Sequence, residues 1–169
     1  ADLGACLAGG GQGDLLVMMD TSASLADTDP QDQRVKAAGY LLQQLASFAD
    51  QTDASLDVAI AGFAHEFDLT RDWTALTGDS VDSLVDSVND YAAKKDGWET
   101  DYLLALNGAR SALRDKAGAG DCQALVWFSD GMYDLDVRDT AGEQDAYGTR
   151  KPYGPDVELT TKAAEFEVE

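Results

Sequence analysis

One segment near the start of the chain constrains the fold more than any other: residues 14–24 read DLLVMMDTSAS. Five apolar residues in succession, between Gly-rich and polar sequence, predict a strand that is buried on both faces. The strand should end at Asp20, and Ser22 and Ser24 follow at alternate positions. Open α/β sheets bind ligands at the carboxyl ends of their strands, so a carboxylate and two hydroxyls are expected at a ligand-binding edge.

Two later motifs add polar groups of the same kind. Thr100 lies in the sequence GWETD of residues 97–101, just before a helix that should begin near Asp101. Asp130 directly follows a second apolar run, residues 123–129, which predicts another buried strand. Carboxylates and hydroxyls are hard oxygen ligands, which suit a small hard cation such as Mg²⁺.

These three motifs, in this order, resemble the metal-ion-dependent adhesion site of von Willebrand factor type A domains, also called integrin inserted domains. The resemblance spans about residues 12 to 135, and three motifs in order are far more specific than Asp-x-Ser-x-Ser alone. It implies an α/β fold, Rossmann-like and doubly wound, with a mostly parallel central sheet and helices on both faces. It also implies a divalent cation, Mg²⁺ first with Mn²⁺ or Ca²⁺ as alternatives, held by Asp20, Ser22, Ser24, Thr100 and Asp130.

For each of these residues a purely structural role is an alternative. Asp20 could cap a turn, and Ser22 and Ser24 could cap the segment that follows. Thr100 could be the N-cap of the helix near residue 101, and Asp130 with Gly131 forms a common turn sequence. All of these coincidences would have to fall at one edge of one sheet, so we favour the metal site.

The resemblance implies a non-enzymatic module that binds a protein partner by docking a Glu or Asp of that partner at the metal. Two other functions are weighed against it. One is an intracellular relative that works beside an ATPase of the MoxR or chelatase type. The other is a metal-dependent phosphohydrolase with Asp20 as nucleophile, which would need a second Asp where this chain has Ser22. His65 is the single histidine, so no Ser-His-Asp or Cys-His set is predicted either, and we expect no enzymatic activity.

The 169 residues fit one domain, 1–169. Residues 1–13 are expected to be a loose, Gly-rich entry segment that is tied down if Cys6 forms a disulfide. A helix should run from Asp29-Pro30 to near Ala49. Residues 56–63 predict a strand that pairs with residues 66–70 in an antiparallel hairpin. We interpret residues 132–155 as an insertion loop and 156–169 as the start of a further helix. A complete family domain has one or two more strand and helix units, so the C-terminal part is expected to be truncated.

The net charge of −20 argues against nucleic acid as a partner, because a phosphate backbone would be repelled. No apolar run is long enough for a membrane helix, so direct membrane insertion is not expected. There are two cysteines, Cys6 and Cys122. The family fold places the strands that follow them side by side, which implies a disulfide between them; two buried free thiols are the alternative. A disulfide would indicate an oxidising location, outside the cell or in the cell envelope.

Overall fold

The computed structural model describes residues 3–52, 54–97, 99–116, 118 and 122–131. Its centre is a four-stranded sheet in the order β3-β2-β1-β4. The strands are β1 (Gly13–Asp20), β2 (Leu56–Phe63), β3 (Phe67–Ala75) and β4 (Cys122–Phe128). Strand β1 runs parallel to both of its neighbours, β2 and β4, and β3 is the one antiparallel strand of this sheet.

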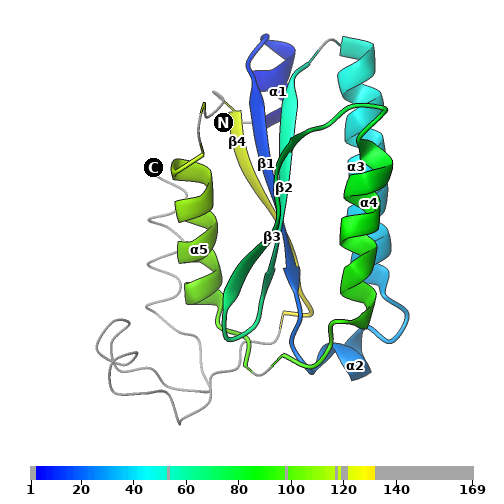
Figure 1. The fold of residues 1–169 in the computed structure, drawn as a ribbon, viewed down its shortest axis with the longest axis vertical. Helices are drawn as coiled ribbons and strands as arrows, with labels where there is room; N and C mark the ends of the chain where they lie inside the picture. The colour runs from blue at the N-terminus through cyan, green and yellow to red at the C-terminus, as the bar shows by residue number, and fades with distance from the viewer. Residues whose placement is uncertain (1–2, 53, 98, 117, 119–121, 132–169) are drawn as a thin grey trace.

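Helices lie on both faces of the sheet, as predicted. Helices α3 and α4 cover one face and α5 covers the other (Figure 1). The helical elements are α1 (Leu3–Ala8), α2 (Leu25–Thr28), α3 (Gln33–Thr52), α4 (Val81–Asn89), the 3₁₀ helix η1 (Asp90–Ala93) and α5 (Tyr102–Arg114). The predicted doubly wound, mostly parallel α/β fold is therefore confirmed.

The alternation of side chains along β1 divides the core into two layers. Leu15, Val17 and Met19 pack in the layer formed with α3 and α4, whereas Leu16 and Met18 pack in the layer formed with α5. All five side chains are fully buried, as expected for a strand covered on both faces. Burial of side chains of this size contributes about 1.5–3 kcal/mol each to the free energy of folding, so β1 is a main source of the stability of the core.

Several predicted boundaries need correction. The entry segment is not loose throughout, because residues 3–8 form α1. The helix predicted from Asp29 begins instead at Gln33, and a short helix that was not predicted, α2, precedes it. The hairpin after β2 is confirmed as antiparallel, although β3 extends to Ala75. The predicted insertion loop 132–155 and the predicted helix start 156–169 lie outside the described residues.

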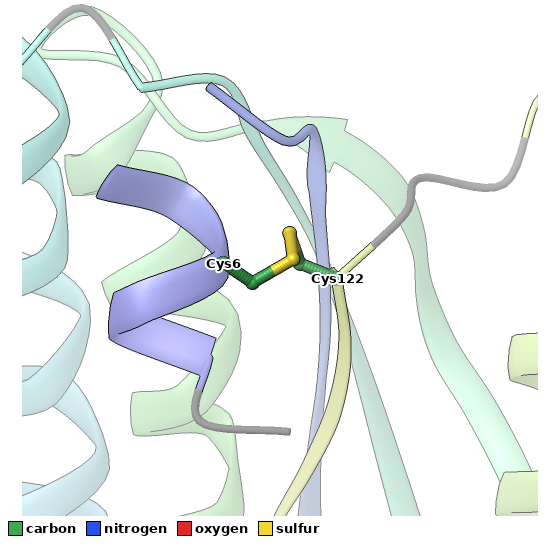
Figure 2. Close-up of a disulfide and its surroundings, with 2 residues drawn as sticks. All are labelled: Cys6 and Cys122. Atoms are coloured by element: carbon green, nitrogen blue, oxygen red, sulfur yellow. A yellow bond between two sulfur atoms is a disulfide. The ribbon is translucent and has the colours of Figure 1, made fainter. Parts of the chain in front are cut away.

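The predicted disulfide is present. Cys6 of α1 is bonded to Cys122 at the start of β4, with their Cα atoms 5.8 Å apart (Figure 2). Gly11 passes close to this bond, and a Cβ added there would lie 2.5 Å from the Cys122 sulfur. The bridge thus attaches α1 to the sheet at the edge where β1 and β4 begin.

We predict that loss of this disulfide lowers the free energy of unfolding. The two cysteines are 116 residues apart, and for a loop of that size the chain-entropy model gives about 4–5 kcal/mol, with smaller values common in practice. Denaturant unfolding of the wild type, with and without reductant, measures the effect. The double variant Cys6→Ser/Cys122→Ser is the control, because reductant should not change its stability. Equal stability of the oxidised and reduced wild type would contradict this prediction.

Candidate metal centre at the carboxyl edge of the sheet

The parallel pairing of β1 and β4 brings their carboxyl ends together. Met19 lies opposite Phe128 in the ladder, so Asp20 and Ser129 leave the sheet at the same edge, followed by Asp130. Asp20 is fully buried, whereas Asp130 is partly exposed. The edge therefore holds one inner carboxylate and one outer carboxylate.

Both oxygens of the Asp20 carboxylate accept hydrogen bonds from the protein. Oδ1 accepts from the backbone amide of Ser22 at 2.8 Å, and Oδ2 accepts from the hydroxyl of Ser129 at 2.7 Å. The Tyr102 hydroxyl lies 2.8 Å from the same Ser129 oxygen. Burial raises the pKa of Asp20; the hydrogen bonds from Ser22 and Ser129 act in the opposite direction, and the nearby charge of Asp130 raises it further. Burial thus makes the negative charge on Asp20 unfavourable.

A chain of hydroxyls connects the inner loop to the outer carboxylate. The Ser22 and Ser24 hydroxyl oxygens are 3.1 Å apart. Ser24 donates to Asp130 Oδ2 at 2.6 Å, and Thr28 of α2 donates to the same oxygen at 2.8 Å. Ser24 occupies the N-cap position of α2 but makes no capping hydrogen bond with its side chain, so its hydroxyl is directed to the site and not to the helix.

The segment that carries Thr100 lies against the Ser22 segment. Gly97 pairs with Ser22 in a parallel bridge, its amide donates to the Thr21 carbonyl at 2.9 Å, and its carbonyl accepts from the Ala23 amide at 2.9 Å. A Cβ on Gly97 would lie 2.7 Å from that Thr21 oxygen, so only glycine fits this approach. Thr100 itself is 2 % exposed. Its segment is therefore at the same edge as Asp20 and Asp130.

The alternative role for Thr100 as the N-cap of α5 is wrong. Asp101 is the N-cap, and its carboxylate accepts from the Leu104 amide at 2.9 Å. The turn alternative for Asp20 is partly right, because its bond to the Ser22 amide closes an Asx turn. That turn also fixes the carboxylate in place, so it is compatible with a ligand-binding role.

Other residues at this edge were missed by the sequence analysis. Thr28 was missed because α2 was not predicted, and Ser129 because it reads as the last residue of a strand. Tyr102 gave no signal beyond its place at the start of a helix. The functional signal for all three was their proximity in sequence to Ser24, Asp130 and Thr100 respectively.

Arg34 is a further buried residue behind the site. Its guanidinium Nη1 lies 2.9 Å from Asp29 Oδ2, and the Asp29 carboxylate also accepts from the backbone amides of Gln33 and Arg34. Burial would raise the pKa of Asp29, but the hydrogen bonds from Arg34 and Gln33 prevail and hold the pKa below its usual value. This capping explains why α3 begins at Gln33 instead of near Pro30.

Nitrogen- or acid-rich metal sites do not occur in the described part of the chain. No group of three or more His, Cys, Asp or Glu side chains there is arranged to hold a metal ion. The His65 side chain is about half exposed, as expected for a loop residue. Any cation site at the carboxyl edge must therefore depend on hydroxyls as well as the two carboxylates.

Residues 15–132, most of the chain, match the model of the von Willebrand factor type A domain. The chain belongs to this family. Within the described residues, this von Willebrand factor type A domain has no helix that is both long and apolar enough to cross a membrane. A search of curated protein sequences gives no match.

Two solved structures resemble the domain in fold. One is the von Willebrand factor domain of the type V pili tip protein Mfa5 from Porphyromonas gingivalis, with 16% identity and a TM-score of 0.58, covering 73% of this chain and 39% of that one. The other is a mutant of the PilB minor pilin from Streptococcus sanguinis, with 14% identity and a TM-score of 0.59, covering 88% and 41%. The chain thus spans about two-fifths of the length of these proteins.

We predict that the contact between Arg34 and Asp29 makes stability fall in acid. Since the folded pKa of Asp29 is below the unfolded value of about 3.9, its contribution is complete above that value and is lost as the pH falls through the folded pKa. Asp29→Asn should lower stability at neutral pH and flatten the loss below about pH 4. Urea unfolding across a pH series measures this, with Asp27→Asn on exposed α2 as the control. A slope that Asp29→Asn leaves unchanged would contradict the assignment.

Proposed function

We propose that this domain is a non-enzymatic, metal-dependent protein-binding module that works outside the cell or in the cell envelope. The observation that carries the proposal is the run of hydrogen-bonded polar groups at one sheet edge, from the Asp20 carboxylate through the Ser22 amide and the Ser22 and Ser24 hydroxyls to Asp130. The fold and the family support this function, whereas the bound cation and the protein partner are proposed.

The donor set fits a hard divalent cation. Both carboxylates reach this edge, and the printed hydrogen-bond donors to the Asp20 carboxylate, the Ser22 amide and the Ser129 hydroxyl, are uncharged. The oxygens of Ser22 and Ser24 are 3.1 Å apart, a separation that two ligands of one Mg²⁺ can have. Neutralisation of Asp20 and Asp130 would remove the unfavourable charge that burial creates at Asp20. Mg²⁺ suits this set best, and Mn²⁺ and Ca²⁺ take the same kinds of ligand.

Each residue has a distinct role in this proposal. Ser22 and Ser24 would bind the cation through their hydroxyls, with Thr100 as a third hydroxyl from the neighbouring segment. Asp20 and Asp130 would supply negative charge, directly or through water. When bound, the cation would supply a strong local attraction for one further oxygen ligand from outside the chain. Hydroxyls in place of more carboxylates keep that attraction strong, because the cation is not over-neutralised.

The proposed partner is a protein that presents a Glu or Asp. The domain carries a net charge of −20, so an acidic partner is repelled at long range and needs a strong short-range attraction. The proposed cation is the feature of this edge that could provide it. The Cys6–Cys122 disulfide supports an oxidising location, and the structural neighbours named above are pilus proteins.

The two alternative functions are less well supported. The disulfide weighs against an intracellular partner of a MoxR or chelatase-type ATPase. The phosphohydrolase alternative needs an acid at position 22, where the structure has a serine whose hydroxyl lies against Ser24. The Asp20 carboxylate is also fully buried and occupied by two donors, which is poor placement for a nucleophile.

We predict that a divalent cation stabilises the wild-type domain and that Ser22→Ala/Ser24→Ala removes this effect. A ligand that binds only the folded state, at a concentration 100 times its Kd, adds about 2.7 kcal/mol to the free energy of unfolding. Thermal unfolding and calorimetric titration with Mg²⁺, Mn²⁺ and Ca²⁺ measure it. The exposed pair Ser47→Ala/Ser55→Ala should respond to the cations as the wild type does.

Two results would overturn the proposal. One is a wild type whose unfolding and calorimetric signal do not respond to millimolar concentrations of any of the three cations. The other is hydrolysis of a generic phosphate ester that is lost in Asp20→Asn, which would favour the phosphohydrolase instead.

A further inference from the structure

Arg34 contacts three segments of the chain from a buried position. It lies in the first turn of α3 and is 7% exposed. Its Nε donates to the backbone carbonyl of Asp20 at 3.2 Å, and Nη1 lies 2.9 Å from Asp29. Its Nη2 donates to the carbonyl of Tyr91 at 2.7 Å and of Lys94 at 3.0 Å. One planar guanidinium thus joins the end of β1, the connection before α3, and η1 together with the residue that follows it.

Lys95 connects two of these segments a second time. Its Nζ donates to the Asp29 carbonyl at 2.6 Å and lies 2.7 Å from Asp32 Oδ1. Asp32 has a left-handed backbone, with φ of 57°, and its amide donates to the Asp29 carbonyl at 3.2 Å. A non-glycine residue in this conformation needs support from its surroundings, and the contact with Lys95 supplies it. We call Arg34, Lys95, Asp29 and Asp32 the loop clamp.

The segments that the loop clamp contacts lead along the chain into both sides of the candidate site. The backbone carbonyl of Asp20 accepts a hydrogen bond from Arg34, and Asp20 begins the segment that carries Ser22 and Ser24. Three residues after Lys94, Gly97 makes the two backbone hydrogen bonds to Thr21 and Ala23. Thr100 follows in the same segment. The residues on the two sides of the site are therefore connected behind it through Arg34 as well as through the Gly97 bridge.

We propose that Arg34 and Lys95 are positioning residues that hold the Ser22 segment and the Thr100 segment in one arrangement, so that cation affinity at the carboxyl edge depends on a cluster that need not touch the cation. This inference rests on the proposed function for the affinity part only; the connection between the segments stands without it. The chain has 12 Lys and Arg residues against 32 acidic ones, and two of the 12 are used here. Outer residues that orient ligands commonly affect metal affinity as strongly as some ligands do.

The test separates positioning from plain stability. Arg34→Met removes the guanidinium and all of its hydrogen bonds. Two variants serve as controls. Arg71→Met removes an arginine whose side chain, among the described residues, bonds to Thr74 and Ser83, and Leu42→Ala weakens the core on the same helix as Arg34. Hydrogen exchange by NMR reports the backbone amides of Ala23 and Gly97, which join the two segments. These amides should exchange about tenfold faster in Arg34→Met through local opening, and at the wild-type rate in both controls.

The second readout is Mn²⁺ affinity by calorimetry. We expect Arg34→Met to weaken it about tenfold, with Arg71→Met and Leu42→Ala within about twofold of the wild type. If Arg34→Met does not fold, Lys95→Met replaces it and should give the same pattern.

The outcomes are distinguishable. Wild-type exchange at Ala23 and Gly97 in Arg34→Met overturns the connection between the segments. Faster exchange with unchanged Mn²⁺ affinity overturns the positioning role. Faster exchange in a domain whose wild type binds no cation overturns the proposed function while the connection between the segments survives.

Discussion

The parallel pairing of β1 with both β2 and β4 is the constraint on which the rest of the structure depends. Because three neighbouring strands point the same way, every loop that leaves their carboxyl ends reaches the same edge. Burial of β1 on both faces fixes its register, since a slip of one residue would exchange the side chains of the two core layers. The disulfide adds a covalent tie at the opposite edge, where β1 and β4 begin. The core thus determines which edge of the sheet these loops reach.

The carboxyl edge concentrates negative charge in a place where burial makes charge costly. Asp20 is buried, and its carboxylate accepts hydrogen bonds from the Ser22 amide and the Ser129 hydroxyl, two uncharged donors. Structural carboxylates at this depth are usually paired, as Asp29 is with Arg34. This contrast between Asp20 and Asp29, which are nine residues apart in sequence, supports the proposed cation.

Sequence patterns predicted the elements whose structure follows from neighbouring residues in the chain. The apolar run before Asp20 predicted β1, and the same kind of run predicted β4 and the position of Asp130, because strands buried on both faces have an unbroken apolar sequence. The resemblance to a known family supplied the disulfide and the pairing of β1 with β4. Arg34 could not be predicted, since a single arginine in a helical pattern reads as exposed and its partners Tyr91 and Lys94 are 57 and 60 residues away. The start of α3 was misplaced because Asp29 caps it from four residues before Gln33.

The most direct test of the central claim is a crystal structure of the wild-type domain grown with Mn²⁺, with diffraction recorded at the manganese absorption edge. The account predicts an anomalous peak within about 2.0–2.6 Å of the Ser22 and Ser24 hydroxyl oxygens, with Asp20, Thr100 and Asp130 in direct contact or one water away. The same crystals of Ser22→Ala/Ser24→Ala should lack the peak. An anomalous map without a peak at this edge in the wild type, or with its peak elsewhere on the domain, would contradict the account.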